Sequence, residues 1–171
     1  MSTLITTNGN ITNVNTGTIK DAGGNTTAMT IDSSGRVFQP TKPAACFHYQ
    51  GSNLAGANIV PLNTQTVLQG GMSMSSNAIT LPVSGLYVIG YHHLSAITSA
   101  HAVFFVRING ATNSILSSGW ATQYRGAQTN NNFAFSTIAP LSAGNTVDFY
   151  ISSGQIHGNA DYNSMYVYLL G

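Results

Sequence analysis

The sequence carries very little charge. Among its 171 residues there are five lysines and arginines, four aspartates and no glutamate, so that charged residues make up 5% of the chain. Exposed helical faces are usually built from Glu, Lys, Arg, Leu and Ala, whereas β-branched and aromatic residues suit strands, and Asn and Gly suit turns. The surface must be made polar by Ser, Thr, Asn and Gln, and the composition predicts an all-β protein.

Cysteine, basic clusters and long apolar runs are also scarce. Cys46 is the single cysteine, which excludes an intrachain disulfide and a cysteine-based zinc site. The formal net charge is +1, and the five basic residues are spread along the chain, so we expect no nucleic-acid partner. No run of about 18 apolar residues is present, and the first ten residues lack the pattern of a signal peptide. We therefore expect no membrane insertion and no secretory route.

The first 40 residues differ from the rest. Their apolar residues stand singly among Thr, Asn and Gly, so no segment there can bury a core by itself. The high content of Thr and Ile favours extended pieces that pair with copies of the same chain over disorder. Pro40 and Pro43 then form a stiff linker, because proline fixes φ and extends the residue before it. We expect an attachment segment at 1–40 and one compact domain at 41–171.

The compact domain contains a series of strand patterns separated by Gly, Asn and Ser clusters, as in a β sandwich. Asn109 and Gly110 follow one of these patterns and predict a tight turn. Period-two alternation predicts that Phe104, Val106 and Ile108 share the inner face of one strand. The same alternation assigns Val147, Phe149 and Ile151 to the core, with Asp148 and Tyr150 opposite. The predicted strands are 45–49, 65–68, 78–81, 86–94, 102–108, 132–140, 146–151 and 165–170.

The last of these patterns is apolar on both faces. Met165, Val167 and Leu169 alternate with Tyr166, Tyr168 and Leu170. A strand with two apolar faces is normally buried on both sides. We therefore expect this strand to be covered on both sides.

Five positions between residues 79 and 91 carry a family resemblance. Ile79 lies six residues before Gly85, and Tyr87, Ile89 and Tyr91 follow that glycine at alternate positions. The arrangement resembles the strand signature of the C1q/TNF-like jelly roll, with isoleucine at two places where the family has an aromatic residue. The resemblance continues in the turn at 141–147, where Asn145 replaces the usual aspartate, and in the closing strand that follows 162–165. It implies an antiparallel jelly-roll sandwich that assembles as a homotrimer.

A second resemblance involves the attachment segment. Residues 18–37, TIKDAGGNTTAMTIDSSGRV, look like a segment that precedes C1q-like heads in bacteriophage structural proteins. This resemblance implies a short intertwined β stalk of three chains. It also implies location in a virion, after synthesis in the host cytoplasm, with other virion proteins bound through residues 1–40.

We expect neither catalysis nor a cofactor. Hydrolytic chemistry needs a nucleophile with a base and an orienting carboxylate, or two carboxylates across a bond. Only Asp148 and Asp161 lie in the compact domain, and no Gly-x-Ser-x-Gly elbow accompanies them. The sequence therefore predicts no catalytic residues.

The five histidines do not form a metal-binding pattern. His92 and His93 are adjacent, so on a strand they must point to opposite faces, and only one of them can join a given site. Satisfied or exposed histidines are the favoured interpretation, and we expect no metal site. A threefold axis that gathers three copies of one histidine remains an open alternative.

The loop at 123–132 is the candidate for contact with other molecules. It combines Tyr124 and Arg125 with several amides, and Trp120 lies just before it. Such groups are common where proteins bind sugars or peptides. The alternative is a solvated loop with Trp120 as a packing anchor.

These observations favour a bacteriophage virion structural protein, namely a homotrimeric tail fibre or fibre tip that attaches to a glycan or protein of the host surface. A trimeric capsid decoration, or cement, protein is the first alternative. A free carbohydrate-binding module is the second.

Overall fold

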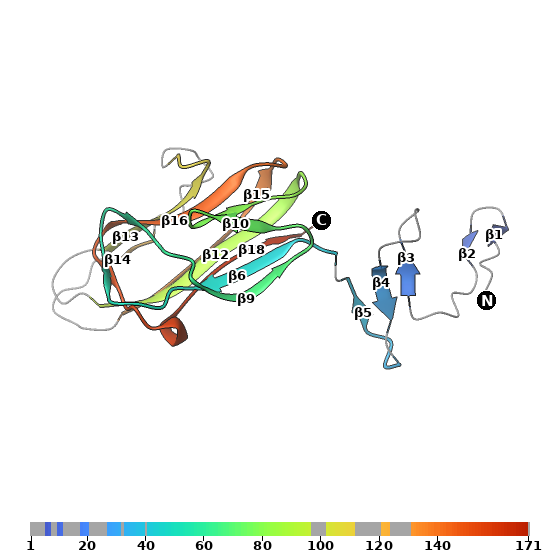
Figure 1. The fold of residues 1–171 in the computed structure, drawn as a ribbon, viewed down its shortest axis with the longest axis horizontal. Coiled ribbons are helices and arrows are strands. Elements are labelled where there is room, and N and C mark those ends of the chain that lie inside the picture. Colours follow the sequence, from blue (N-terminus) through green and yellow to red (C-terminus); the bar gives the residue numbers. More distant parts are fainter. Residues whose placement is uncertain are drawn as a thin grey trace. The chain divides into compact units, whose positions relative to one another are not determined.

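The structure is a computed structural model that describes residues 6–7, 10–11, 18–20, 27–31, 33–39, 41–96, 102–111, 121–123 and 131–170. Within these ranges it is all-β, with antiparallel sheets and one 3-10 turn, Ala160–Tyr162, but no α-helix (Figure 1). The chain divides into two compact units, Met1–Lys42 and Pro43–Gly171.

The first unit contains two small antiparallel sheets. One is a hairpin of two short strands, and the other has three strands in the order β3-β4-β5. Apolar side chains stay exposed on the three-stranded sheet: Ile31 is 38%, Val37 58% and Phe38 62% exposed. These three apolar side chains, which belong to the described part of the unit, are therefore not covered within one chain. The strands are β1 (Thr6–Thr7), β2 (Asn10–Ile11), β3 (Thr18–Lys20), β4 (Thr27–Ile31) and β5 (Val37–Phe38).

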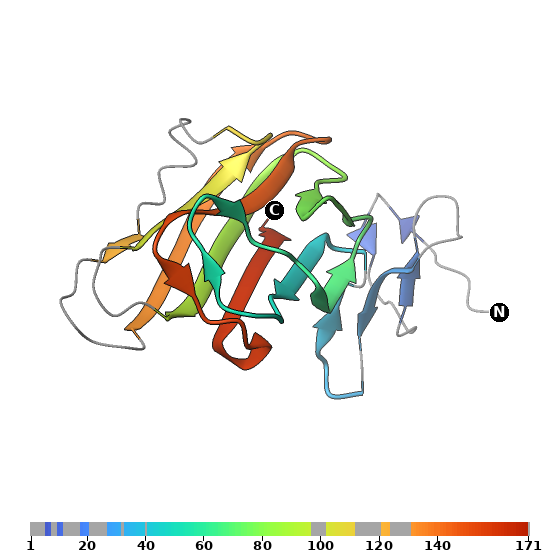
Figure 2. The same cartoon turned by 60° about the vertical axis from the view of Figure 1, so that its left-hand side comes forward.

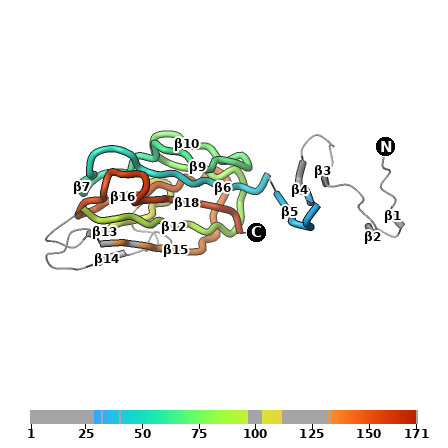
Figure 3. The backbone as a smooth tube through the Cα atoms, turned by 90° about the horizontal axis from the view of Figure 1, so that it is seen from below, coloured from blue at the N-terminus to red at the C-terminus, as the bar shows by residue number. Residues whose placement is uncertain are grey.

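The second unit, which we call the head, has two sheets. In the first sheet, β12 lies between β15 on one side and β18 on the other, and β18 is followed by β6 and β9. Beyond the end of β18, the short strands β17 and β7 continue the same side of β12 (Figures 1 and 3). The strands are β6 (Ala44–His48), β7 (Leu54–Ala55), β9 (Thr64–Gln69), β12 (Gly85–Ser95), β15 (Asn131–Leu141), β17 (Gln155–Ile156) and β18 (Asn163–Leu169).

The second sheet of the head has the order β10-β11-β16-β13-β14, with β8 also paired to β16 (Figure 2). All the predicted strands of the head are present to within two residues at each end. The strands are β8 (Asn58–Ile59), β10 (Ser73–Ser75), β11 (Ala78–Thr80), β13 (Ala102–Ile108), β14 (Ala121–Gln123) and β16 (Thr146–Ser153).

The core lies between the two sheets and is filled by alternate side chains of each strand. The prediction for β13 is confirmed, because Phe104, Val106 and Ile108 are all buried. The same holds for Val147, Phe149 and Ile151 of β16. The motif that resembles the C1q/TNF-like strand signature also contributes to the core. Tyr87, Ile89 and Tyr91 enter it from β12 in the first sheet, and Ile79 enters it from β11 in the second sheet.

Two predicted turns are confirmed. Asn109 and Gly110 have φ values of +53° and +72°, the left-handed region that a tight hairpin turn requires. In the turn after β15, the backbone N–H of Ser142 donates to Asn145 Oδ1 at 2.9 Å, and the N–H of Asn145 donates to the Ser142 carbonyl at 3.1 Å. Asn145 thus closes this turn with its own amide oxygen.

The prediction for β18 is wrong for the single chain. Met165 and Val167 are buried in the core, but on the other face Tyr168 is 41% exposed. Leu170, just after the strand, is 46% exposed. The described elements of one chain cover only the inner face of this sheet, which leaves its outer face open.

Candidate functional site

The predicted ligand-binding residues Trp120, Tyr124 and Arg125 lie outside the described residues. Two described surfaces of the head are candidates for contact with other molecules. We call them the open face, on the outside of β15, β12, β18 and β6, and the loop end, around the 3-10 turn Ala160–Tyr162.

One end of the open face is apolar. Leu86 is 44% and Ile138 57% exposed. Ile138 lies in one row with the exposed Tyr168, because both residues pair with Val88 of β12, one from each side. Leu86 lies two residues before Val88 and so on the same face of β12. Between β9, β6 and β18 the surface forms a shallow hollow. Burial raises the pKa of the Cys46 thiol in that hollow. The hollow is lined by Ala44, Ala45, Cys46, Val67, Tyr166 and Tyr168.

The other end of the open face carries two histidines on either side of Ser164. His92 pairs with Ser164, and His48 is the next strand's neighbour of Ser164, since Phe47 pairs with Met165. We call His48, Ser164 and His92 the histidine row. The ring nitrogen His92 Nδ1 lies 2.7 Å from Ser164 Oγ.

The protonation of His48 follows from its contacts. His48 Nδ1 lies 2.5 Å from the carbonyl oxygen of Asn163 and 3.1 Å from that of Ala160. A carbonyl oxygen can only accept, so Nδ1 must carry the hydrogen and donate it. The other ring nitrogen, Nε2, therefore keeps its lone pair in the neutral ring. The pKa of His92 lies below its ordinary value, because partial burial disfavours the charged ring and because His48 is near.

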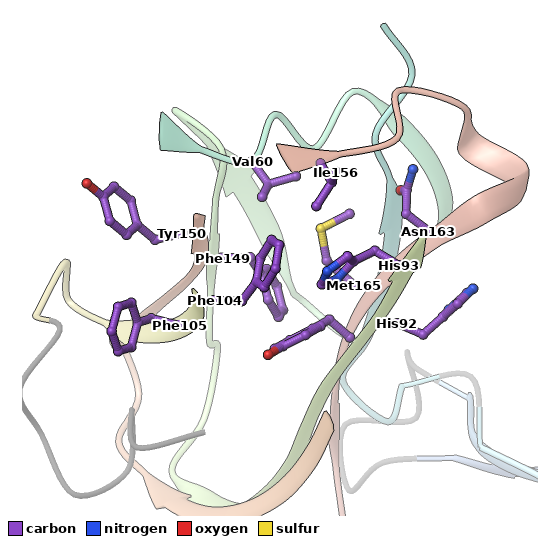
Figure 4. Close-up of a pocket in the computed structure, with 11 residues that line it drawn as sticks. Val60, His92, His93, Phe104, Phe105, Phe149, Tyr150, Ile156, Asn163 and Met165 are labelled. Atoms are coloured by element: carbon purple, nitrogen blue, oxygen red, sulfur yellow. The ribbon is translucent and has the colours of Figure 1, made fainter. Parts of the chain in front are cut away.

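His92 and His93 point to opposite sides of β12, as the sequence predicts. His92 is exposed, whereas His93 is 4% exposed and faces the core (Figure 4). Its ring centroid lies 3.9 Å from that of Phe104 and 5.4 Å from that of Tyr91. Burial, with a smaller contribution from His92, lowers the pKa of His93 to about 3. The cavity beside it measures about 20 Å³, which is room for one water molecule at most.

Asn163 braces the loop end. Its side chain is 1% exposed and accepts the backbone N–H of Tyr49 at 2.6 Å. Its amide nitrogen donates to the carbonyls of Tyr49 at 2.9 Å and Asn159 at 2.8 Å. One buried side chain thus joins the end of β6 to the 3-10 turn. The loop end presents Tyr162, which is 45% exposed and packs edge-on against His157 at 5.0 Å.

The described residues hold no group of three or more His, Cys, Asp or Glu side chains that could bind a metal ion. An ion pair joins Arg107 Nε to Asp148 Oδ1 at 2.6 Å, on the outer face of the second sheet. This pair has a structural role, because Asp148 is 4% exposed and the Arg107 guanidinium also lies over the Tyr150 ring.

The sequence indicated His48 and His92 separately but not their meeting with Ser164. The signal was present in part, since each is an outward position of an alternating strand. The local sequence pattern does not indicate the strand pairing, which brings His92 next to Ser164, 72 positions later, and near His48, 44 positions earlier.

No protein-family model matches this chain, and no curated protein matches its sequence. In the part of the chain that the structure describes, no helix has the length and apolar character needed to span a membrane.

Proposed function

We propose that the head is a C1q/TNF-like jelly roll. Apart from β7–β10 and β17, its strands in chain order are β6, β11 to β16 and β18. The first of these pairs with the last, β6 with β18, and the second with the seventh, β11 with β16. The third pairs with the sixth, β12 with β15, and the fourth with the fifth, β13 with β14. This nested antiparallel pairing is the pattern of a long hairpin rolled into two sheets, which supports the proposal.

The head forms a homotrimer through the open face. The apolar end of that face includes Leu86, Ile138 and Tyr168, each at least 41% exposed. A contiguous apolar face with little charge is typical of permanent interfaces and uncommon on monomers. Copies of the same chain are the occupant that suits it, because their open faces are equally apolar. Closure around a threefold axis buries all the copies of the face at once.

The first unit assembles in the same way. Ile31, Val37 and Phe38 are exposed on its three-stranded sheet and need apolar partners. Three intertwined copies supply them, and the segment 1–40 then provides the attachment to other virion proteins. Both units of the chain are in this sense incomplete as monomers.

The function that these features support best is that of a bacteriophage virion structural protein, a homotrimeric tail fibre or fibre tip that attaches to the host surface. The observation that carries it is the pair of uncovered apolar surfaces, one on each unit. The braced loop end, with Tyr162 exposed, suits contact with a glycan or protein of the host.

The trimer is tested by light scattering of the purified full chain. We expect three times the chain mass of 17.9 kDa. Ile138→Asp and Tyr168→Asp place charges on the open face and should give monomers or dimers that keep the β-sheet circular dichroism spectrum. Tyr162→Asp, an exposed residue of the loop end, is the matched control and should stay trimeric. A monomeric wild-type chain would overturn the assembly.

The virion role is tested separately by cryo-electron microscopy of particles that contain this chain. A few copies at the tail support the fibre, whereas hundreds of copies on the shell identify a decoration protein. Absence from particles, together with glycan binding by the isolated trimer, would identify a free binding module instead.

A further inference from the structure

We propose that the histidine row makes the trimer sensitive to acid, because protonation of His48 and His92 places positive charges inside the interface and separates the copies. The inference rests on the proposed trimer, since it needs the open face to be covered by neighbouring copies. It adds a property that assembly alone does not imply, namely a pH below which folded single chains are favoured.

The histidine row lies on the face that the trimer buries. His48 of β6 and His92 of β12 are outward positions of the first sheet, and Ser164 of β18 lies between them. The side chain of His92 points away from the core, in contrast to that of His93 (Figure 4). The exposed Tyr168 belongs to the same strand and the same face as Ser164. Closure of the copies over this continuous face therefore takes both rings out of water.

Both rings have hydrogen-bond partners in the neutral form. His48 Nδ1 donates to the main-chain carbonyls of Asn163 and Ala160. His92 Nδ1 contacts Ser164 Oγ at 2.7 Å, and a hydroxyl can accept or donate a hydrogen bond. Protonation adds one charge and one further N–H group to each ring. In the covered interface both additions need partners, whereas in the free chain water supplies them.

The surroundings of the row do not compensate such charges. Among the described outward positions near it, the other titratable groups are the Cys46 thiol and the Tyr166 phenol, which are both neutral in acid. The outward positions around the row are Asn132, Ala134 and Ser136 on β15, Gly90 and Leu94 on β12, Tyr166 on β18, Cys46 on β6 and Thr64 on β9.

Carboxylates are scarce beyond this face as well. The 3-10 turn beside His48 carries Asp161, which is exposed, and within the described part of the chain the structure gives no ion pair between Asp161 and either ring. The whole chain has four aspartates and no glutamate, so a neighbouring copy has few carboxylates to offer. Protonated rings in the interface are therefore buried charges without partners, which are strongly destabilising.

The direction of the pH dependence follows from these contacts. Partial burial, and to a smaller extent the nearby His48, already lower the pKa of His92 in the single chain. Covering the row removes more water and lowers this pKa further. Since the free chain binds the proton more readily, the trimer is fully stable above the free-chain pKa and loses stability as the pH falls through it. Each chain contributes two such histidines, so dissociation takes up several protons and is steep.

The test is light scattering of the purified full chain at one concentration, between about pH 7.5 and pH 5. We expect three times the chain mass of 17.9 kDa at the upper end, and a fall towards the mass of the single chain at the lower end. Circular dichroism at each pH checks that the separated chains keep their β-sheet spectrum, which distinguishes dissociation from the unfolding that the buried His93 promotes.

The variants separate charge from shape. His48→Gln combined with His92→Gln should stay trimeric down to about pH 5, because glutamine is polar but takes up no proton. His92→Gln alone should shift the midpoint to lower pH, and it covers the case that His48→Gln does not fold. His92→Lys carries a permanent charge and should raise the concentration needed for trimers at least about tenfold at neutral pH. Asp161→Asn is the control and should keep the wild-type response.

The possible failures are distinguishable. A wild-type chain that is monomeric at neutral pH would overturn the trimer, and this inference with it. A wild-type trimer that keeps its mass at about pH 5, while Ile138→Asp still dissociates it, would overturn the acid response alone. A folded His92→Gln variant with the wild-type midpoint would also overturn it, as would a folded His92→Lys variant that assembles as the wild type does.

Discussion

The ring of Tyr166 lies across Gly90 of the neighbouring strand β12. The two residues are directly paired, and a Cβ added to Gly90 would overlap the hydroxyl end of Tyr166. It would also come within 2.7 Å of the Phe135 carbonyl oxygen on the other side. An aromatic ring that covers a strand glycine compensates for the missing side chain. The middle of the open face is built in this way, between the apolar end and the histidine row.

Gly90→Ala should therefore destabilise the head by about 1–3 kcal/mol, as overpacking usually does. The Tyr166 side chain can move aside, but the Phe135 carbonyl belongs to a paired strand and cannot. Denaturant unfolding measures the change. Ser136→Ala is the matched control, since Ser136 is exposed and faces Gly90 from β15, and its effect should stay within about 0.5 kcal/mol. Equal stability of the two variants would contradict the close approach.

Asn163→Ala should cost about 2–4 kcal/mol, because it leaves the backbone N–H and carbonyl of Tyr49 without their partner in a buried place. Amide hydrogen exchange at Tyr49 should accelerate in the variant, which reports the loop end directly. Asn58→Ala is the comparison: Asn58 also donates to two carbonyls, but it is exposed, and we expect less than about 1 kcal/mol. A loop end held by other contacts would show equal, small effects.

Arg107→Ala should be strongly destabilising, by about 3–5 kcal/mol, because it leaves the 4%-exposed Asp148 as an uncompensated charge. Replacing both residues by apolar ones, Arg107→Met with Asp148→Val, should recover most of that loss. Thermal or denaturant unfolding of the single and double variants forms the cycle. A double variant as unstable as Arg107→Ala would show that the pair does more than satisfy its own charges.

The buried His93 should make the head less stable as the pH falls. Its pKa is about 3 in the folded protein, against about 6.5 in an unfolded chain. Between these values the unfolded state binds the extra proton, so the free energy of unfolding decreases by up to about 1.4 kcal/mol per pH unit as the pH falls. Above pH 6.5 the stability is fully present.

Unfolding is best measured from pH 7 to 4. His93→Phe should have a shallower dependence on pH than the wild type. A His93→Phe slope equal to that of the wild type would show that other groups determine the acid sensitivity.

Most of the fold could be predicted from the sequence, because the strands of the head alternate clearly. Residues 102–108 and 146–151 each place three large apolar side chains on one face, and these side chains enter the core as expected. The missed strands of the head are short: β10 reads Ser-Met-Ser, and β8 has two residues, Asn58–Ile59. Such segments become strands because a neighbouring strand pairs with them, as β11 does with β10 and β16 does with β8, and a local pattern does not contain that information.

The candidate sites were harder to predict. Adjacent histidines on a strand must point apart, and this simple rule gave the directions of His92 and His93 correctly. The histidine row depends on the register between β6, β18 and β12, which the alternation of each strand leaves open. Asn163 was equally inconspicuous, because its importance comes from backbone groups more than 100 positions earlier in the chain.

The position of β18 determines when the head can fold during synthesis. This strand lies between β6 and β12, yet it is made more than 60 residues after both. Until residues 163–169 have left the ribosome, the two earlier strands have no neighbour on the sides where they will later meet β18. The nascent head must stay open, and its pairing is dominated by contacts distant in sequence, which is typical of slow folding. The first sheet can therefore be completed, and assembly can follow, only after translation of the head is nearly complete.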